Sequence, residues 1–292
     1  MTHSSAPSTD SLVARSAAAP LPPADELAQR FPVRPNPQLR TVDQRAEVLR
    51  NLQFGVEFTD HMARATWTPE DGWQNLRVEA FGPLQLSPAA AVLHYGQEIF
   101  EGLKAYRHDD GSVWTFRPGF NAARLSASAR RLALPELDAQ DMVASLAALV
   151  RTDADWVPES TGASLYLRPF MFAAEPFLGV RAAREVEYLV IASPVGPYFV
   201  NGFKPVSIWV SEDYHRAGPG GIGAAKTGGN YAASLLPQAE AYDKGFEQVC
   251  FLDAATGTRV EELGGMNVFV VDADGTVRTP ELTGTILEGG TR

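Results

Sequence analysis

Lysine is the residue type whose position in this chain points most directly to chemistry. A lysine that forms a Schiff base must be partly buried, and its amine needs a pKa below the usual value of about 10.4. Lys226 stands in the run Ala-Ala-Lys-Thr-Gly-Gly-Asn-Tyr (224–231), where small neighbours let a bulky planar group approach the backbone. The residues alone leave the choice open, because a surface position is the ordinary interpretation of each lysine. The chain has Lys104, Lys204, Lys226 and Lys244.

Six short blocks, one of which contains this lysine, resemble a single enzyme family. Together they are similar to the branched-chain amino-acid aminotransferases, which are fold-type IV pyridoxal-phosphate enzymes. One block alone would be weak evidence, but the six occur in the family's order from about residue 54 to the end of the chain. The blocks are FTDHM (58–62), HYGQEIFEGLKA (94–105), SLYLRP (164–169), KTGGNY (226–231), EELGGMNVF (261–269) and TILEG (285–289).

The resemblance implies roles for three residues that face the cofactor ring. Lys226 would carry pyridoxal 5′-phosphate as a Schiff base and then move the proton between the substrate and the cofactor. Glu262 would face the pyridine nitrogen and keep it protonated, so that the ring accepts electrons. Tyr231 would bond to the phenolate oxygen of the cofactor. Without the resemblance, Glu262 would be a solvated loop carboxylate and Tyr231 a core aromatic; the adjacent Glu261 is expected to be the exposed one of the pair.

A second group of matched residues would hold the cofactor phosphate, which needs a bidentate cation and backbone donors. Arg124 matches the family's phosphate arginine, although on the residues alone it would belong to a solvated helix face. Arg216 matches an arginine that stands near the cofactor. Relatives commonly have a branched aliphatic residue where this chain has Gly290, and the more flexible glycine should weaken phosphate binding. The expected backbone contacts come from Leu287, Gly289, Gly290 and Thr291.

The substrate pocket implied by the resemblance accepts a branched aliphatic side chain and, in turn, the second carboxylate of glutamate. Arg168 matches the arginine for that carboxylate, and strand alternation places Tyr166 and Arg168 on one face. The alternative is a half-buried strand whose arginine pairs with an acid. Gly265 stands where relatives often have a small hydroxylated residue. The expected aromatic wall, in a mostly apolar pocket, consists of Phe54, Tyr95, Phe100, Tyr166 and Tyr198.

The implied activity is transamination between leucine, isoleucine or valine and 2-oxoglutarate in a homodimer. Two other interpretations stay open: a fold-type IV enzyme with another substrate, such as a D-amino-acid aminotransferase or an aminodeoxychorismate lyase, and a catalytically silent chain. Relatives continue for several tens of residues past Arg292, so the sequence is expected to lack a C-terminal segment that completes the second domain.

Alternating strands and helices predict an α/β fold of two domains, a smaller N-terminal α/β domain and an incomplete C-terminal cofactor-binding domain. We expect a disordered extension over 1–40 with one short helical turn near 24–29, an N-terminal domain over 41–198, a linker over 199–204 and the second domain over 205–292. Periodicity predicts helices over 121–132, 139–152 and 231–244. Buried strands are expected over 164–172, 186–193, 205–210, 248–253 and 267–272.

Composition excludes several other classes of protein. A net charge of −10 and a pI near 5.0 argue against a nucleic-acid ligand. Cys250, the one cysteine, rules out an internal disulfide and a cysteine-based zinc site, which fits a cytoplasmic protein; no metal site is expected. The longest aliphatic stretch, around 143–150, is far shorter than the roughly 20 residues of a membrane span. The N-terminus does not resemble a signal peptide.

Overall fold

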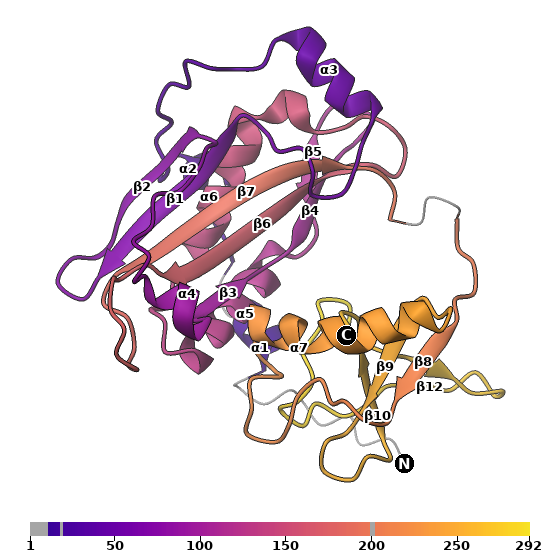
Figure 1. The fold of residues 1–292 in the computed structure, drawn as a ribbon. Helices are drawn as coiled ribbons and strands as arrows, with labels where there is room; N and C mark the ends of the chain where they lie inside the picture. Colours follow the sequence, from indigo (N-terminus) through magenta and orange to yellow (C-terminus); the bar gives the residue numbers. More distant parts are fainter. Residues whose placement is uncertain (1–10, 18–19, 199–201) are drawn as a thin grey trace. The chain divides into compact units, whose positions relative to one another are not determined.

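The computed structural model describes residues 11–17, 20–198 and 202–292. The chain divides into two compact units, Met1–Val200 and Asn201–Arg292, and Figure 1 shows their ribbons. The predicted linker over 199–204 has its first three residues outside the described part. Among the described residues, no helix is long and apolar enough to cross a membrane.

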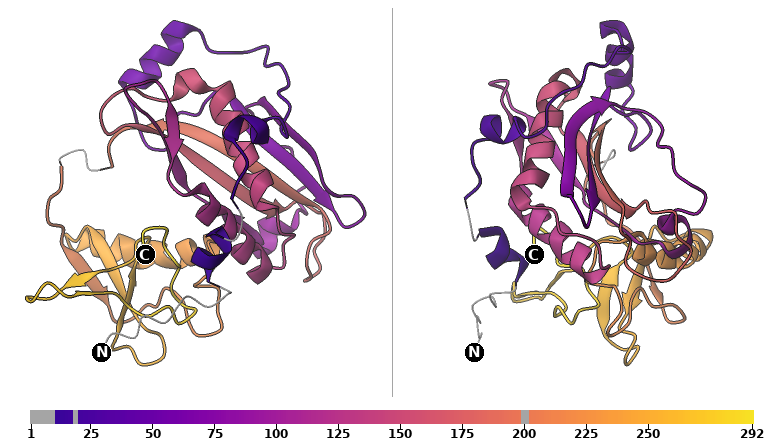
Figure 2. Two further views of the ribbon diagram at one scale, coloured as in Figure 1. Left: turned by 180° about the vertical axis from the view of Figure 1, so that it is seen from behind. Right: turned by 90° about the vertical axis from the view of Figure 1, so that its left-hand side faces the viewer.

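The first unit contains a seven-stranded sheet whose strands follow the order β2-β1-β7-β6-β4-β5, with β3 also paired to β6. Each of these pairs is antiparallel. Figures 1 and 2 show the helices α2, α5 and α6 against one face of this sheet. The elements are α1 (Leu12–Ala17), α2 (Ala24–Ala28), α3 (Val42–Arg50), β1 (His61–Thr68), β2 (Gly72–Ala80), α4 (Ala91–Tyr95), β3 (Glu98–Phe100), β4 (Leu103–Arg107), β5 (Val113–Thr115), α5 (Pro118–Arg131), α6 (Ala139–Thr152), a 3₁₀ turn (Ala154–Trp156), β6 (Ser164–Ala173) and β7 (Val186–Val195).

Local sequence explains where the two long helices start. Pro118 occupies the first turn of α5, where its missing N–H costs nothing. Asp138 caps α6, because its carboxylate accepts from the Gln140 N–H at 2.7 Å. The predicted helix over 139–152 has the bounds of α6, and the one over 121–132 lies largely within α5.

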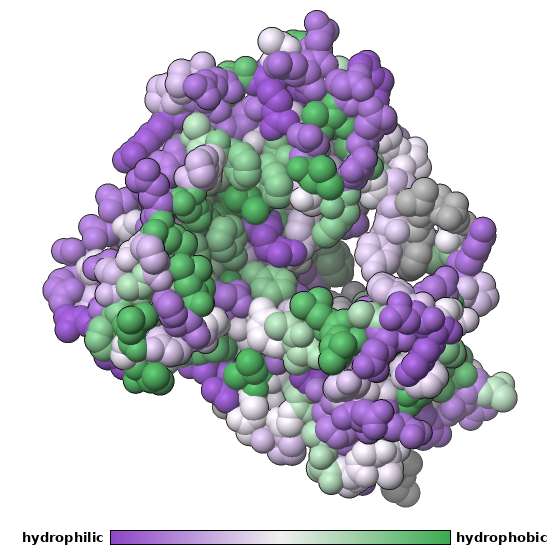
Figure 3. All heavy atoms as spheres, in the orientation of Figure 1, coloured by the Kyte–Doolittle hydropathy of each residue, from purple (hydrophilic) through white to green (hydrophobic). Residues whose placement is uncertain are grey.

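Strand alternation separates the two faces of the sheet. In β6, Leu165, Leu167 and Met171 belong to the main core with the helices, and each is fully buried. Tyr166 and Arg168 occupy the opposite face, as predicted, and both are half-buried. Figure 3 shows apolar residues gathered in a hollow on this open face, over β6 and β7.

The expectation of a disordered segment over 1–40 is wrong for residues 20–40. This part contains α2, which matches the predicted turn, and it places Leu27 and Phe31 in the main core at 2% and 1% exposure. Arg34 N–H donates to Val78 O at 2.8 Å, so the segment is also bonded to β2. Its Ser, Ala and Pro content suggested disorder, but two large apolar side chains are enough to anchor it. Residues 1–10 and 18–19 lie outside the described part.

The second unit has a three-stranded sheet in the order β10-β9-β8 and a separate two-stranded hairpin. β8 and β9 are parallel, which requires a crossover, and the connection contains α7. Of the predicted strand over 267–272, only Val270–Val271 forms a regular strand. The elements are β8 (Ile208–Ser211), α7 (Gly228–Asp243), β9 (Gln248–Leu252), β10 (Val260–Leu263), β11 (Val270–Val271) and β12 (Val277–Arg278).

Candidate functional site

Lys226 lies two residues before α7, in a loop held by buried neighbours. Ala225 and Thr227 are 2% and 1% exposed, while Lys226 itself is half-buried. The side chain of Asn230 donates to Ile222 O and Ala225 O, both at 2.8 Å, and so closes the loop onto the start of the helix. These two hydrogen bonds therefore constrain the backbone around Lys226, although glycines follow it.

The amine of Lys226 has a defined partner in the same unit. Its Nζ donates to the hydroxyl oxygen of Tyr231 at 2.7 Å, and it lies 5.2 Å from the centre of that ring. Tyr231 is in the first turn of α7, so helix geometry fixes its direction. A Cβ on Gly265 would lie 3.9 Å from the Tyr231 ring, which places this glycine beside the tyrosine. The second unit thus brings Lys226, Tyr231 and Gly265 together.

Glu262 is a buried carboxylate of the second unit, with an exposure of 3%. Its Oε2 is 3.1 Å from Arg216 Nη1 and accepts the Leu287 N–H at 3.2 Å. Burial raises the pKa of Glu262 above its usual value, and the charge of Arg216 with the Leu287 N–H opposes this only in part. A carboxyl group of this kind retains its proton to a higher pH than a solvated glutamate does.

Arg216 ties three segments of the second unit together. Besides Glu262, its Nη1 donates to Thr285 O at 3.0 Å and to Gly223 O at 3.3 Å. Its Nε is buried and has no hydrogen-bond partner among the described residues. The arginine is 5% exposed, so its positive charge lies inside the unit.

The expectation for Glu261 is wrong, because this residue is buried at 7% exposure. The hydroxyl of Thr285 donates to Glu261 Oε1 at 2.5 Å. Glu261 and Glu262 therefore both bind the segment 285–287. Glu261 accepts from the Thr285 hydroxyl, and Glu262 accepts from the Leu287 backbone N–H. Adjacent residues in a regular strand face opposite ways, but the pairing of β10 with β9 is irregular between Val260 and Glu262, which allows both carboxylates to be buried.

The segment predicted to bind phosphate is only partly arranged as expected. The Leu287 N–H points to Glu262. At Gly289 a Cβ would collide with Asn267 Oδ1, so a larger residue there would have to displace the Asn267 side chain. Asn267 also donates to Leu287 O at 2.9 Å, which fixes this turn. Gly290 and Thr291 follow, half-buried and exposed respectively.

Arg124, in the first unit, is buried in an ion pair that the sequence did not reveal. The solvated-face alternative is wrong, since the residue is 7% exposed. Its Nε and Nη2 donate to the two carboxylate oxygens of Glu101 at 2.7 and 2.9 Å. Asn121, one turn earlier on α5, donates to Glu101 Oε2 at 2.8 Å. Glu101 is the functional candidate that sequence reasoning missed. The spacing of Asn121 and Arg124 on one helix face was the available signal.

Four of the predicted pocket residues form a cluster on the open face of the first unit's sheet. The guanidinium of Arg168 lies 4.7 Å from the centre of the Phe100 ring, and its Nη2 donates to the Tyr166 hydroxyl at 2.8 Å. Phe54 packs edge-on against Tyr166, with ring centres 5.1 Å apart. Arg168 Nε is buried and has no hydrogen-bond partner among the described residues.

The other two predicted wall residues lie outside these contacts. Tyr95 ends α4 and donates to Leu178 O, with 44% of its surface exposed. Tyr198 lies three residues after β7 and is 65% exposed. Of the five predicted wall residues, the contacts around Tyr166 and Arg168 therefore bring together Phe54, Phe100 and Tyr166.

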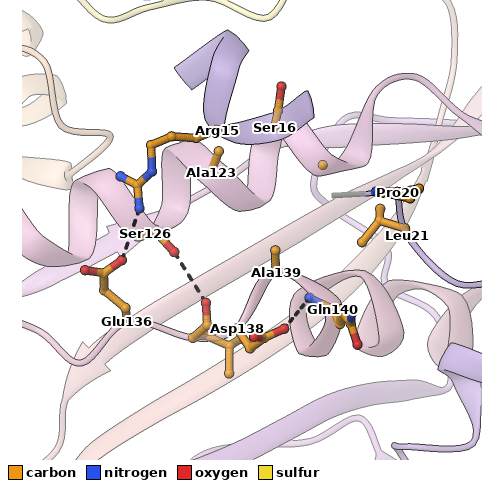
Figure 4. Close-up of a pocket in the computed structure, with 12 residues that line it drawn as sticks. Arg15, Ser16, Pro20, Leu21, Ala123, Ser126, Glu136, Asp138, Ala139 and Gln140 are labelled. Carbon is orange, nitrogen blue, oxygen red and sulfur yellow. Dashed lines mark hydrogen bonds and ion pairs between the residues drawn. The ribbon is translucent and has the colours of Figure 1, made fainter. Parts of the chain in front are cut away.

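Clear cavities lie elsewhere in each unit. One of about 520 Å³ is bounded by α1 and residues 20–21, by α5, and by residues 136–140 at the start of α6. Figure 4 shows Arg15, Glu136 and Asp138 around it, with Glu136 bound to Arg15 and Asp138 capping the helix. In the second unit a cavity of about 320 Å³ contacts the buried Glu261. No predicted site residue lines either cavity.

Comparison with known proteins identifies related sequences over most of the chain. Residues 98–292 match the family model described as amino-transferase class IV. The branched-chain-amino-acid aminotransferase of Mycolicibacterium smegmatis is 55% identical over 266 residues, which cover 90% of this chain and 72% of that protein. A probable branched-chain-amino-acid aminotransferase of Streptomyces coelicolor is 59% identical over 250 residues, 85% of this chain and 69% of that protein.

Solved structures of branched-chain amino acid aminotransferases have a similar fold. A branched-chain amino acid aminotransferase from T.th., solved with pyridoxamine 5′-phosphate, has a TM-score of 0.63 at 26% identity, covering 78% of this chain and 71% of that one. The enzyme from Escherichia coli has a TM-score of 0.62 at 26% identity, with the same two shares covered. The predicted α/β, fold-type IV architecture is confirmed.

Proposed function

We propose that this chain, which belongs to the class IV aminotransferases, transfers the amino group of leucine, isoleucine or valine to 2-oxoglutarate with pyridoxal 5′-phosphate as its cofactor. The observation that carries the proposal is the half-buried Lys226, whose amine bonds to Tyr231 at 2.7 Å in a closed loop at the start of α7. Identities of 55% and 59% to relatives named for this reaction support the substrate class.

The residues of the second unit fit this cofactor. A planar ring needs a nearby backbone without bulky side chains, and Lys226 is flanked by small residues. A phosphate needs backbone donors, and in the predicted segment Gly289 packs against the side chain of Asn267, which also bonds to Leu287 O. When bound, pyridoxal phosphate supplies an aldehyde carbon that accepts the amino group and a ring that withdraws electrons.

Lys226 has two tasks in this reaction. Its amine would hold the cofactor, and the free amine would move a proton to and from the substrate Cα. The Tyr231 hydroxyl holds Nζ in one direction, and the closed loop restricts the rest of the side chain. A proton carrier with a fixed direction acts on one face of the substrate, which is what selection of an L-amino acid requires.

Glu262 serves the ring nitrogen of the cofactor. Burial raises the pKa of this carboxyl group, and a carboxyl group that faces the ring nitrogen would keep that nitrogen protonated. Arg216 offsets part of the burial cost and keeps the side chain in place. Glu262 also accepts the Leu287 N–H, so the group that serves the ring fixes a neighbouring part of the phosphate segment.

The first unit supplies the groups that recognise the substrate side chain and the phosphate. Phe54, Phe100 and Tyr166 give the apolar contact that a branched aliphatic side chain requires. Arg168, stacked on Phe100, pairs with the second carboxylate when glutamate or 2-oxoglutarate is bound. Arg124 provides the cationic contact for the phosphate.

Reduction with borohydride tests the cofactor proposal. The purified chain is incubated with pyridoxal 5′-phosphate, reduced and mapped by peptide mass spectrometry. We expect a pyridoxyl adduct at Lys226 and none at Lys104 or Lys244, together with visible absorbance that reduction removes. Absence of both signals would refute the cofactor proposal and favour a catalytically silent chain. Turnover of D-alanine but not of L-leucine would instead indicate a D-amino-acid aminotransferase.

We also propose a homodimer in the cytoplasm, which is what the resemblance to the branched-chain enzymes implies. The thiol of Cys250 is buried, and burial raises its pKa, so it is protected from oxidation and needs no oxidising compartment. Equilibrium sedimentation at micromolar protein should give twice the mass of the chain. A single-chain mass at every concentration would contradict the dimer.

A further inference from the structure

We propose that Glu101 is a positioning residue for the cofactor phosphate, because it fixes the direction of the Arg124 guanidinium. The inference rests on the proposed function, since it takes Arg124 as the arginine that meets the phosphate. Glu101 has no other role in the reaction as described above. Both Glu101 and Arg124 lie within the first unit.

The contact between the two side chains has the geometry of a fork. Arg124 donates Nε to Oε1 at 2.7 Å and Nη2 to Oε2 at 2.9 Å, one donor to each carboxylate oxygen. A bidentate contact of this kind fixes the plane of the guanidinium as well as its position. It engages Nε and Nη2, and so fixes the direction in which the other N–H groups of the guanidinium point.

Burial and a third partner make the fork rigid. Glu101 has no exposed surface, so its carboxylate cannot exchange Arg124 for water. Asn121 donates to Oε2 at 2.8 Å and to Gly102 O at 3.3 Å, which binds the carboxylate to the helix and to the following residue. Phe120 lies under the guanidinium, with the ring centre 5.6 Å from the Arg124 Cζ.

The backbone around Glu101 connects this arginine to the substrate cluster. The Glu101 N–H donates to Pro169 O at 2.7 Å, next to Arg168 on β6. Phe100 contacts the Arg168 guanidinium, and a Cβ at Gly102 would collide with the Tyr166 hydroxyl. The residues before and after Glu101 thus face the substrate cluster, while its own side chain faces Arg124. One tripeptide sets the position of both recognition elements.

The test compares two ligands that differ only in the phosphate. The cofactor-free full chain is titrated with pyridoxal 5′-phosphate and with pyridoxal, and binding is followed by visible absorbance. Glu101→Gln is close in shape but gives one acceptor instead of two. We expect its affinity for pyridoxal 5′-phosphate to fall about tenfold, as for loss of one charge-assisted hydrogen bond, while its affinity for pyridoxal stays within about twofold of the unchanged chain.

A double-mutant cycle gives the matched control. Arg124→Lys keeps the charge but loses the fork, and we expect it to remove most of the preference for the phosphorylated ligand. Adding Glu101→Gln to Arg124→Lys should then have no further effect on this preference. Asn121→Ser removes only the third partner, so it should reduce this preference in the same direction but by less. It replaces Glu101→Gln in the test if that variant does not fold.

Separate outcomes refute the inference and the proposed function. Equal losses for both ligands, a stronger preference for the phosphorylated one, or additive effects in the cycle would overturn the positioning role of Glu101. Failure of the unchanged chain to bind pyridoxal 5′-phosphate at all would overturn the proposed function. If that chain binds it and neither Glu101→Gln nor Asn121→Ser changes the ratio of the two affinities, only the positioning role fails.

Discussion

The two units hold their functional groups in different ways. In the first unit, Arg124, Arg168 and Tyr166 project from a long helix and a central strand. A single apolar core links that helix and strand to α2, α4, α6, β1, β2, β3, β4 and β7. In the second unit, Lys226 and Arg216 lie on loops, and the apolar cluster contains only Ala241, Val249 and Phe251 among its buried members.

Polar contacts therefore hold the functional groups of the second unit in place, whereas apolar packing holds those of the first. Arg216 alone joins the segments at Gly223, Glu262 and Thr285. Buried charges of this kind are costly when one partner is removed, but the energy of apolar packing is spread over many residues. The reactive loop should thus be sensitive to single polar substitutions, and the recognition unit to substitutions in its core.

The largest expected effect concerns the reactive loop itself. Lys226→Met removes the amine that carries the proton, and we expect kcat for L-leucine to fall by at least about 10³-fold, within the range of general acid–base catalysis. Steady-state kinetics with cofactor in excess measures this. Lys244→Met, at the end of α7, is the control and should retain activity. Near-normal activity of Lys226→Met would place the chemistry on another residue.

Arg216→Met tests whether one buried charge holds the second unit together. It leaves Glu262 without its cation, so we expect a loss of about 3–5 kcal/mol in the unfolding free energy of that unit. Hydrogen exchange of peptides from β9 and β10, compared with peptides from β6, reports each unit separately. Combining Arg216→Met with Glu262→Gln should recover part of the loss. Equal losses in both units would contradict the proposed difference between them.

Leu27→Ala is the corresponding test for the first unit. Leu27 is buried in the main core, and removing a side chain of this kind costs about 2–5 kcal/mol. Urea unfolding followed by the exchange of β6 and β7 amides measures the effect. Val33→Ala, at a position that is 52% exposed, is the control and should change stability little. A negligible effect of Leu27→Ala would mean that residues 20–40 are not part of the core.

The contrast between the units also explains what the sequence could predict. Periodic apolar residues define α6 and β6 to within one residue, and alternation places Tyr166 and Arg168 on one face. Those patterns arise directly from helix and strand geometry. The loop residues Lys226 and Glu262 have no such pattern, and only their resemblance to a known family assigned roles to them.

The errors have a common physical origin in contacts between distant segments. Glu101 and Arg124 are 23 positions apart. The spacing of Asn121 and Arg124 places both on one helix face, but it does not identify Glu101 as their partner. Glu261 is buried because Thr285 returns to it from a later loop. Phe31 is anchored by strands and helices that follow it in the chain. Local composition cannot predict burial that a distant segment provides.

The smallest expected effect is a dependence of stability on pH that Glu262 imposes. Burial raises the pKa of Glu262 above 4.5 in the folded chain. Between 4.5 and that raised value, the folded chain keeps a proton that the unfolded chain has released, so the unfolding free energy should fall as pH rises through this window.

Glu262→Gln has no such proton, so its stability should lack this component. The difference in unfolding free energy, unchanged chain minus variant, should therefore decrease as pH rises above 4.5 and then become constant. Urea unfolding at closely spaced pH values, read from the second unit, measures it, with Glu281→Gln as an exposed control in the same unit. A difference that increases with pH would mean that Arg216 outweighs burial. The polar network would then stabilise the ionised carboxylate, and the stability of the second unit would depend on the ion pair of Glu262 with Arg216 more than on the exclusion of water.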